Sequence, residues 1–206
     1  MKKAFRFFAI AAIAFGMTMA VSCKPDEEGE GGGNGGSNTE NLPTTLDETF
    51  ASGIPSTWTN IDADGDGYKW KSTLESSGLA DADGNGAAYS QSYDNNYGEL
   101  TPDNYLVTPK LYIDGTTLTW QVAAQDNRFP EEHYAVYVGT IENGQFVQKG
   151  KLFEETFSGN AKDATAFYNR SVSLADYNGQ SLYIAFRHFD CTDMYFLNID
   201  NVKVSK

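Results

Sequence analysis

The chain has 206 residues, and its 28 acidic side chains outnumber the 15 lysines and arginines, which gives a formal net charge of −13. Such an acidic chain is a poor binder of nucleic acid or of an anionic membrane surface, because both partners require a basic patch. Its two cysteines are too few for a disulfide-rich scaffold. We therefore expect no nucleic-acid partner and a domain that can hold cations.

Residues 1–22 have the form of an export signal. Three basic residues precede an apolar stretch from Phe7 to Val21, which ends in small side chains directly before Cys23. This stretch is short for a membrane span and has the flanks of a secretory signal. It resembles a bacterial lipoprotein signal, with Ala20 where leucine is most common, and the resemblance implies that Cys23 is lipidated. The alternative is an ordinary secreted protein cut nearby.

Residues 23–44 are predicted to be the lipidated cysteine and a flexible tether. The segment after Cys23 begins with an acidic cluster and continues as glycine-rich sequence with almost no apolar side chains. A coil of this kind spans on the order of 25 Å. The acidic cluster also resembles the signal that sends some lipoproteins to the outer face of the outer membrane. We therefore expect an outer-membrane lipoprotein facing the cell exterior, touching the membrane only through its lipid, with a periplasmic orientation as the alternative.

The segment from Asp62 to Gly67 is the clearest candidate for a metal site. It places Asp62, Asp64 and Asp66 at alternate positions beside two glycines, and calcium takes about six to eight oxygen ligands of this kind. An EF-hand would also require flanking helices and a glutamate at the twelfth position, which is Thr73 here. We therefore predict a calcium loop on a β scaffold, with a turn that binds no ion as the alternative.

A second acidic run, from Asp81 to Gly86, echoes the first. Its twelfth residue is Ser92 rather than glutamate, so the two runs do not form a dockerin-like pair. A turn is the preferred interpretation of this run, with a metal loop as the alternative.

Residues 45–206 are predicted to form one domain of short antiparallel strands. The segments are rich in Val, Tyr, Phe, Thr and Trp and are separated by turn sequences. Apolar side chains recur at every second position, as in Leu118, Trp120 and Val122. No stretch of the mature chain keeps a helical period for long. The prediction is an all-β fold of about ten strands, a two-sheet antiparallel jelly-roll sandwich.

The last strand has an irregular pattern. Leu197 and Ile199 share one parity, whereas Val202 and Val204 share the other. This change requires a slip at Asp200-Asn201, which predicts a β-bulge that aims a carboxylate out of the regular pleat.

Six segments between residues 46 and 204 carry a family resemblance. They are ETF at 48–50, IDADGDGYKW at 61–70, LTPDNYLVTP at 100–109, EHYAVYV at 132–138, LFEET at 152–156, and FRHFDCTD at 186–193 followed by LNIDNV at 197–202. Together they resemble the cleaved-adhesin domains of gingipain and haemagglutinin surface proteins, a family also called choice-of-anchor J. The resemblance implies a calcium-containing jelly roll, similar to carbohydrate-binding modules, that acts in adhesion rather than catalysis. The gingipain members are tandem parts of secreted proteases, so their specific binding roles are not carried over.

The resemblance also implies where calcium is held. In similar β-sandwich modules a calcium lies between the first and last strands, which nominates Glu48 and Asp200. The other site is the loop of residues 62–67, with Asp193 as a candidate further ligand. Asn201 stands where the family usually has a second aspartate, which leaves Asp200 as the carboxylate there. The alternative for Glu48 and Asp200 is pairing with lysines at the surface.

The sequence does not indicate a catalytic site. The only histidines, His133 and His188, lack the helical spacing of a zinc protease, and we expect both to be structural or surface residues. Cys191 and His188 are three residues apart and are expected to face differently, so an inert buried thiol is predicted. The pair Glu154-Glu155 resembles ordinary exposed acids more than the paired carboxylates of a glycosidase. We predict that the chain is not an enzyme.

Binding is the predicted function, and aromatic side chains near loops are the expected ligand contacts. Tyr68, Tyr93 and Tyr97 lie in Asn-, Gly- and Asp-rich surroundings, where they would stack on a sugar or pack against a partner protein. The alternative is that they are partly exposed packing residues, and the three tryptophans are expected in the core. The main hypothesis is a surface-anchored, calcium-stabilised adhesin that recognises a glycan or a host protein. A structural or accessory subunit of a cell-envelope complex is the alternative, and a hydrolase is the third.

Overall fold

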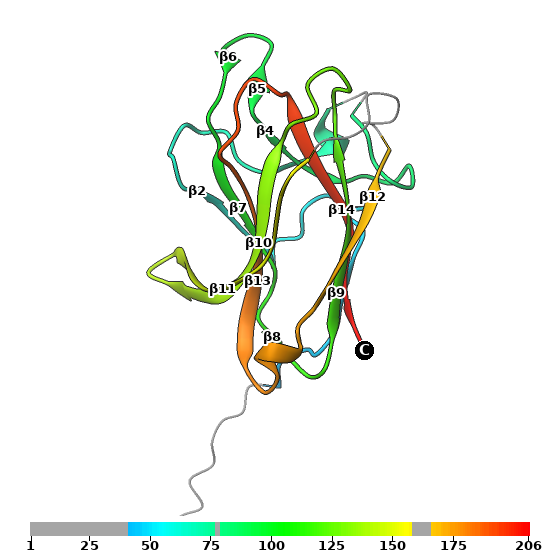
Figure 1. The fold of residues 1–206 in the computed structure, drawn as a ribbon, viewed down its shortest axis with the longest axis vertical. Coiled ribbons are helices and arrows are strands. Elements are labelled where there is room, and N and C mark those ends of the chain that lie inside the picture. The colour runs from blue at the N-terminus through cyan, green and yellow to red at the C-terminus, as the bar shows by residue number, and fades with distance from the viewer. Residues whose placement is uncertain (1–40, 77–78, 158–165) are drawn as a thin grey trace, which may run out of the picture. The chain divides into compact units, whose positions relative to one another are not determined.

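The computed structural model describes residues 41–76, 79–157 and 166–206, whose strands form two antiparallel sheets that face each other (Figure 1). The signal sequence, Cys23 and most of the predicted tether lie outside these residues. Within the described ranges, no helix is both long and apolar enough to cross a membrane.

The described residues contain fourteen strands, five of them only two or three residues long, and two 3₁₀ helices. The first sheet consists of β1 (Leu46–Glu48), β3 (Lys71–Ser72), β4 (Ala88–Gln91), β9 (Thr117–Ala124), β12 (Tyr168–Ser173) and β14 (Phe196–Ser205). The second consists of β2 (Thr59–Asp62), β7 (Asp103–Val107), β8 (Leu111–Tyr112), β10 (His133–Glu142), β11 (Gln145–Thr156) and β13 (Ser181–Phe189). The strands β5 (Tyr93–Asp94) and β6 (Gly98–Glu99) form a separate hairpin, and the 3₁₀ helices are η1 (Thr73–Glu75) and η2 (Ala175–Tyr177).

Strands that are distant in sequence are neighbours in both sheets. The first sheet has the order β12-β9-β14-β4-β3, with β1 also paired to β14, and the second has the order β11-β10-β13-β7-β2, with β8 paired to β13. All of these ladders are antiparallel. This arrangement confirms the predicted jelly-roll sandwich, in which successive strands cross between two packed sheets.

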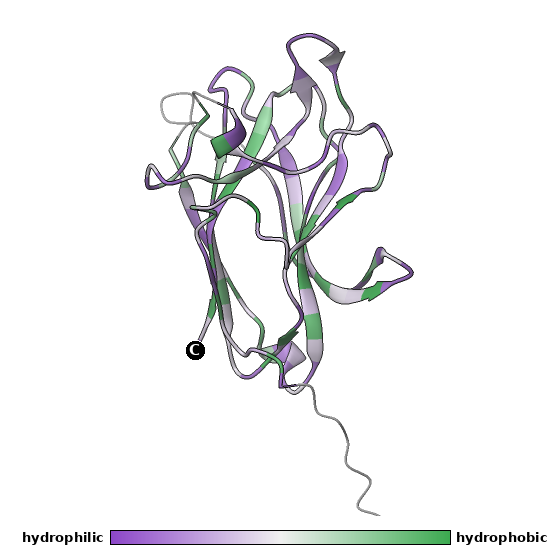
Figure 2. Ribbon diagram, turned by 180° about the vertical axis from the view of Figure 1, so that it is seen from behind, coloured by the Kyte–Doolittle hydropathy of each residue, from purple (hydrophilic) through white to green (hydrophobic). Residues whose placement is uncertain are grey.

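The main core lies between the two sheets. In β9 the side chains of Leu118, Trp120 and Val122 are buried in this core, while the residues between them are only partly buried. Trp58 and Trp70 lie in the same core, as the sequence predicted for the tryptophans. Figure 2 shows the resulting alternation of hydrophobic and hydrophilic residues along the strands. Burial of this apolar surface is the main stabilising contribution to such a fold.

The outer face of the second sheet departs from simple alternation. Tyr105, Val107 and Ala185 form a small separate apolar cluster there with Ile61, and Phe146 packs against it. Because this face is also covered, β10 is buried over six consecutive positions.

The last strand breaks register at the predicted place. The ladder between β14 and β9 shifts between Asp200 and Lys203, and Asn201 has a φ of 49°, a left-handed conformation that asparagine adopts more readily than most residues. On its other edge, β14 pairs with β4 through residues 196–199 and with β1 through residues 202–204. Asp200 therefore stands where β14 changes partner.

The two ends of the sandwich carry different elements. The β5–β6 hairpin lies at the upper end in Figure 1, and β8 lies at the lower end. The Pro43 carbonyl accepts a hydrogen bond from the Tyr112 amide in β8 (3.0 Å). The first described residues therefore enter the domain at the end opposite the hairpin.

Candidate functional site

The predicted calcium loop follows β2 and closes around backbone amides. Asp62 accepts hydrogen bonds from the amides of Gly65 (2.7 Å, at Oδ1) and Gly67 (2.9 Å, at Oδ2), and Asp66 Oδ1 accepts one from the Tyr68 amide (2.7 Å). Both glycines have a positive φ, which glycine adopts without steric strain. One oxygen from each of the three predicted aspartate ligands lies within 4.8 Å of the others. The loop thus gathers the carboxylates at one point.

The three carboxylates in this loop repel one another. Burial, together with a hydrogen bond to Asp62 and the negative charge of Asp66, raises the pKa of Asp64 to about 6. Burial also opposes ionisation of Asp62, but hydrogen bonds from Asp64 and from the backbone amides outweigh it and lower the pKa of Asp62. The three aspartates offer carboxylate oxygens to a metal, and these are the ligands that calcium prefers. A bound cation would favour the charged form of Asp64 and so oppose the burial and the like charges that raise its pKa.

Asp200 forms a second acidic corner with the 81–86 loop. Its side chain is fully buried, and its oxygens accept hydrogen bonds from the amides of Ala82 (3.1 Å) and Asn201 (2.6 Å). Burial, with a smaller effect of the negative charges of Asp83 and Asp81, raises the pKa of Asp200 to about 6 against the effect of these amides. The second acidic run, interpreted from sequence as a turn, therefore faces the predicted ligand Asp200.

Glu48 borders the same loop from another side. It ends β1 opposite Val202, and its Oε1 accepts a hydrogen bond from the Phe50 amide (2.7 Å). The Phe50 carbonyl would lie 3.0 Å from a Cβ added to Gly86. The 81–86 loop therefore packs between the segment after Glu48 and the bulge at Asp200.

Asp193 does not join the acidic loop of residues 62–67. The acidic group that converges there comprises only the three loop aspartates among the described residues. Asp193 has a φ of 60°, and its amide donates to the Ser92 carbonyl (3.0 Å). Its side chain instead lines a cavity at the upper end of the sandwich.

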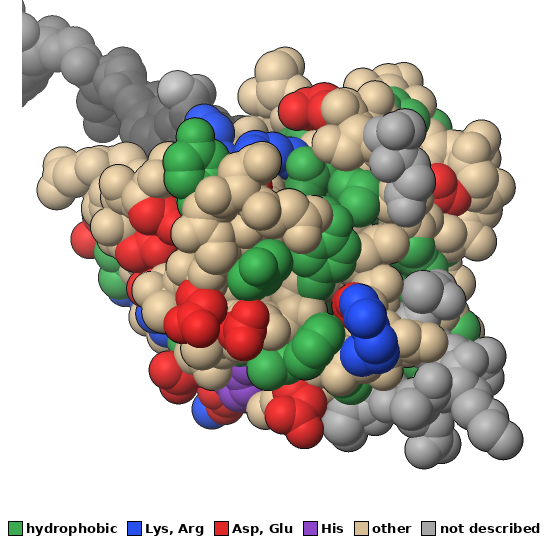
Figure 3. Space-filling model, turned by 90° about the horizontal axis from the view of Figure 1, so that it is seen from above, with side chains coloured by type: hydrophobic (Ala, Val, Ile, Leu, Met, Phe, Trp, Pro, Cys, Tyr) green, Lys and Arg blue, Asp and Glu red, His purple; other side chains and the backbone are tan. Residues whose placement is uncertain are grey.

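This upper-end cavity has a volume of about 390 Å³ and combines aromatic and charged side chains. Its lining includes Tyr93, Phe129, Tyr195, Asp126, Arg128 and Asp193. Arg128 donates to both carboxylate oxygens of Asp126, from Nε (3.2 Å) and Nη2 (2.8 Å), and Phe129 is 46% exposed. Figure 3 shows hydrophobic side chains gathered in the middle of this end, with charged ones beside them. Such a lining can stack on a ring and bind hydroxyl groups.

The predicted ligand tyrosines gather around the β5–β6 hairpin. Tyr93 lines the upper-end cavity, whereas the rings of Tyr68 and Tyr97 meet edge to face with centroids 6.4 Å apart. Tyr97 is 80% exposed, and the Lys71 ammonium lies 5.2 Å from the Tyr68 ring centroid. Because the Tyr68 amide donates to Asp66, the acidic loop helps to fix one of these rings.

Sequence reasoning missed Arg128, Phe129 and Tyr195 as cavity residues. A signal for one of them was present, because Phe129 is a large apolar residue directly after the polar run from Gln125 to Arg128. No comparable signal marked Tyr195, which precedes a strand and stacks on Phe196 with ring centroids 3.9 Å apart.

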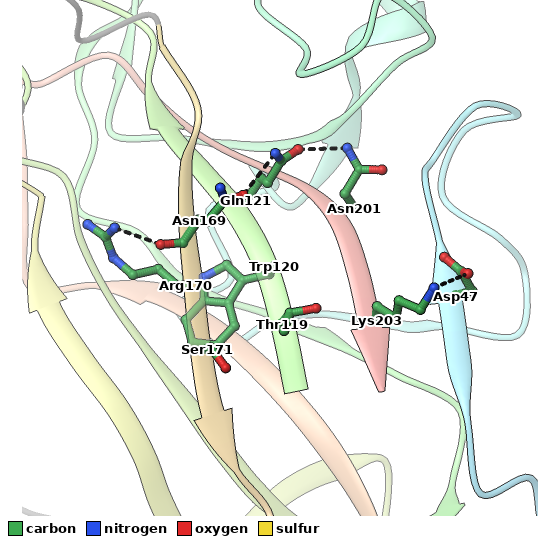
Figure 4. A pocket seen from close by; sticks show the side chains of 9 residues that line it. All are labelled: Asp47, Thr119, Trp120, Gln121, Asn169, Arg170, Ser171, Asn201 and Lys203. Atoms are coloured by element: carbon green, nitrogen blue, oxygen red, sulfur yellow. Dashed lines mark hydrogen bonds and ion pairs between the residues drawn. The ribbon is translucent and has the colours of Figure 1, made fainter. Parts of the chain in front are cut away.

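A second hollow lies on the outer face of the first sheet (Figure 4). Its volume is about 540 Å³. Gln121 links two neighbouring strands there, because its amide donates to Asn169 (3.0 Å) and its carbonyl accepts from Asn201 (2.7 Å). The only aromatic residue in the lining is Trp120, which is 1% exposed. Besides the charged groups of Asp47, Arg170 and Lys203, this hollow offers amides and hydroxyls but no exposed ring on which a sugar could stack.

The expectation that His188 and Cys191 face differently is wrong. Cys191 Sγ lies 3.1 Å from His188 Nε2, because Asp190 between them has a φ of 56° and turns the chain back after β13. Burial, followed by the negative charge of Glu132, raises the pKa of the Cys191 thiol. A protonated thiol is a weak nucleophile, so the proximity does not make this pair a catalytic dyad.

Comparison with known proteins identifies relatives over nearly the whole described domain. The family model described as Cleaved Adhesin Domain matches residues 43–204. Hemagglutinin A of Porphyromonas gingivalis is 40% identical over 185 residues, which cover 83% of this chain and 7% of that protein. Gingipain R1 of P. gingivalis is 40% identical over 169 residues, which cover 78% of this chain and 10% of that protein. The chain thus spans about a tenth or less of the length of these relatives.

Solved structures agree with the sequence comparison. The K1 cleaved adhesin domain of Lys-gingipain from P. gingivalis W83 matches with a TM-score of 0.69 and 40% identity, covering 79% of this chain and 98% of that one. The carbohydrate-binding module TmCBM61, solved with β-1,4-galactotriose, matches with a TM-score of 0.51 at 12% identity over 77% of this chain and 94% of that one, which shows a shared fold alone.

The match to K1 also bears on how the domain folds. The described residues from 41 onward form one compact unit, and the K1 chain, nearly all of which is covered, is a cleaved adhesin domain. The domain therefore has its own core and can be studied without residues 1–40. On these grounds the chain belongs to the cleaved adhesin domain family.

Proposed function

We propose that this chain is a surface-anchored, non-catalytic adhesin whose upper end binds an extracellular glycan. The observation that carries the proposal is the cavity in which Tyr93, Phe129 and Tyr195 stand beside the Arg128–Asp126 pair. Aromatic rings bind the apolar faces of sugars, and carboxylate and guanidinium groups bind their hydroxyls. A host protein with an exposed polar and aromatic surface is the alternative ligand for the same cavity.

Calcium is proposed as the structural cofactor at two places. Asp62, Asp64 and Asp66 supply the oxygens of the first site, and the lone pairs that do not accept backbone hydrogen bonds remain for the ion. Asp200 and the 81–86 loop, next to Glu48, supply the second. A micromolar site in millimolar calcium would stabilise the folded state by about 4 kcal/mol. The ions would hold the loops that frame the ligand-binding end.

The position of the first described residues supports surface display. A chain anchored through Cys23 would enter the domain near Pro43 and Tyr112, which lie at the end opposite the β5–β6 hairpin. An outer-membrane lipoprotein tethered in this way would present the cavity away from the membrane. This proposal rests on the signal and tether inferred from residues 1–44.

An array of glycans and matrix proteins, probed with residues 41–206 in calcium and in chelator, tests the proposed function. We expect binding to a glycan class that Tyr93→Ala and Phe129→Ala reduce at least tenfold, since each removes a stacking surface worth more than about 1.4 kcal/mol. Tyr112→Ala is the matched control, because Tyr112 is 41% exposed and lies at the opposite end. If the folded domain binds nothing, or if Tyr112→Ala weakens binding equally, the proposed site is wrong. Stable envelope partners in a membrane pull-down would then favour the accessory-subunit alternative.

A further inference from the structure

Two buried side chains and a half-buried thiol meet at the upper end of the second sheet. Glu132 lies directly before β10, His188 near the end of β13, and Cys191 in the loop that follows. His188 Nε2 is 2.9 Å from Glu132 Oε2, and Cys191 Sγ is 3.4 Å from that oxygen. Glu132 and His188 have no exposed surface. The three donor atoms therefore form a compact triangle inside the protein.

We propose that Glu132, His188 and Cys191 bind a zinc ion. Carboxylate, imidazole and thiolate are the three side-chain types that bind zinc in proteins. The sulfur disfavours calcium and magnesium, which take oxygen ligands. This site is therefore chemically distinct from the two acidic corners, and the proposal does not depend on the identity of any adhesion ligand.

The distances suit a site in its metal-free form. With metal–ligand distances of about 2.0–2.3 Å, a tetrahedral zinc separates nitrogen from sulfur by about 3.6 Å and nitrogen from oxygen by about 3.4 Å. The corresponding separations here are 3.1 Å for His188 Nε2 to Cys191 Sγ and 2.9 Å for His188 Nε2 to Glu132 Oε2. An ion would therefore need to push the donors apart by about half an ångström, which side-chain rotation can supply.

Neighbouring hydroxyls hold the ligands in place, as in established zinc sites. His188 Nδ1 lies 2.8 Å from Ser90 Oγ, so the nitrogen that would not bind metal has a hydrogen-bond partner that fixes the ring. Ser92 Oγ donates to Glu132 Oε1 (2.9 Å), which leaves Oε2 for the ion. Such hydrogen-bond partners orient the residues that bind the metal and raise the affinity for it.

The site has a route to solvent on the side of the cysteine. Cys191 lines a surface hollow of about 390 Å³ that also includes Asp190, Asp103 and Arg187. Zinc would enter from this hollow, and a water molecule would take the fourth position. Binding converts the Cys191 thiol to a thiolate, and its proton leaves to solvent.

Ser92 joins the cluster to the wall of the upper-end cavity. Ser92 Oγ, which donates to Glu132, accepts hydrogen bonds from the amides of Met194 (3.2 Å) and Tyr195 (3.1 Å). Both of these residues line the cavity. An ion held by Glu132 and Cys191 would therefore fix both ends of the 191–195 segment.

Cobalt substitution tests the site, because tetrahedral Co²⁺ reports a thiolate ligand by its charge-transfer absorption. Chelator-treated residues 41–206, which contain one cysteine, are titrated with Co²⁺ and then with competing Zn²⁺. We expect one equivalent of Co²⁺ to produce the thiolate band and Zn²⁺ to abolish it. In Cys191→Ser the band should vanish, and zinc affinity should fall by about a hundredfold or more, since loss of a partner outside the ligand set already costs about ten- to a hundredfold.

Asp64→Asn is the matched control, because it alters the acidic loop and should leave the cobalt band unchanged. Cys191→Ser is nearly isosteric and its near-ultraviolet circular dichroism verifies folding; His188→Gln provides a second ligand variant. Absence of the thiolate band in folded wild-type protein, or equal zinc affinity in wild type and Cys191→Ser, would overturn the proposal. In that case the cluster is a hydrogen-bond network only.

Discussion

Trp120 and Tyr134 join the two sheets through a hydrogen bond in the middle of the core. Trp120 Nε1 in β9 donates to Tyr134 Oη in β10 (3.1 Å), and both side chains are buried. The Tyr134 hydroxyl donates in turn to Glu155 Oε1 (2.7 Å), and Arg170 donates to both oxygens of Glu155. A polar relay thus crosses the sandwich without leaving its buried groups unpaired.

Tyr134→Phe should destabilise the domain by about 1–3 kcal/mol, because it leaves the Trp120 indole N–H buried without an acceptor. Urea unfolding followed by tryptophan fluorescence measures the change. Tyr112→Phe is the control, since Tyr112 is 41% exposed and should lose almost nothing. Equal stability of Tyr134→Phe and wild type would mean that the relay does not contribute to folding.

Asp64→Asn should separate the cost of charge from the benefit of calcium. In chelator we expect this variant to be at least as stable as wild type. It removes a carboxylate whose charged form is disfavoured by burial and by the neighbouring aspartates. In millimolar calcium we expect the melting temperature of wild type to rise, and this rise should be smaller in the variant, since one ligand is lost. An identical calcium-dependent rise in both proteins would rule out calcium binding at this loop.

The stability of the calcium-free domain should depend on Asp200 between pH 4 and pH 6. Its folded-state pKa of about 6 lies above the ordinary value of 3.8, so the folded state binds the proton more tightly than the unfolded state. Protonation of Asp200 therefore adds to the free energy of unfolding at low pH. About 2 kcal/mol of this stabilisation is lost as the pH rises from 4 to 6.

Comparison with Asp200→Asn isolates this contribution from that of other carboxylates. The variant loses a hydrogen-bond acceptor and is less stable overall, but the difference between it and wild type should shrink as the pH rises from 4 to 6 in chelator. Urea unfolding at several pH values measures this difference. A difference that is constant with pH would contradict the raised pKa.

Gly139→Ala should destabilise the domain by about 2 kcal/mol or more, because the new methyl group overpacks the β10–β11 ladder. A Cβ at this position would lie 2.2 Å from the Val147 carbonyl oxygen and 2.6 Å from Phe146 Cζ. Thr140→Ala is the neighbouring control and loses only an exposed hydrogen bond to Glu142. If the melting temperatures of the two variants fall equally, the close approach of β11 to Gly139 is not rigid.

Local patterns in the sequence were sufficient to predict the sandwich and the acidic loop. The alternation of Leu118, Trp120 and Val122 reflects burial of one strand face, which depends only on neighbouring positions. The change of parity after Ile199 marked the slip that the structure places at Asp200-Asn201. The loop aspartates converge because their spacing and glycines act within six residues.

The upper-end cavity and the buried cluster could not be predicted in this way. Tyr93, Phe129 and Tyr195 meet only because loops from three distant parts of the chain end side by side. The proximity of His188 and Cys191 depends on the left-handed conformation of Asp190, which residue type alone does not specify. Both sites arise from strand order and backbone turns rather than from spacing along the sequence.

The pairing of β1 with β14 also determines how the domain would carry mechanical load. The two strands are antiparallel and share only three residue pairs, from Leu46 opposite Val204 to Glu48 opposite Val202. Because β1 begins at the lower end, a pull on the chain before residue 46 against an object held at the upper end acts along the strand. Such a force loads the ladder in shear, so its hydrogen bonds resist together instead of opening one at a time.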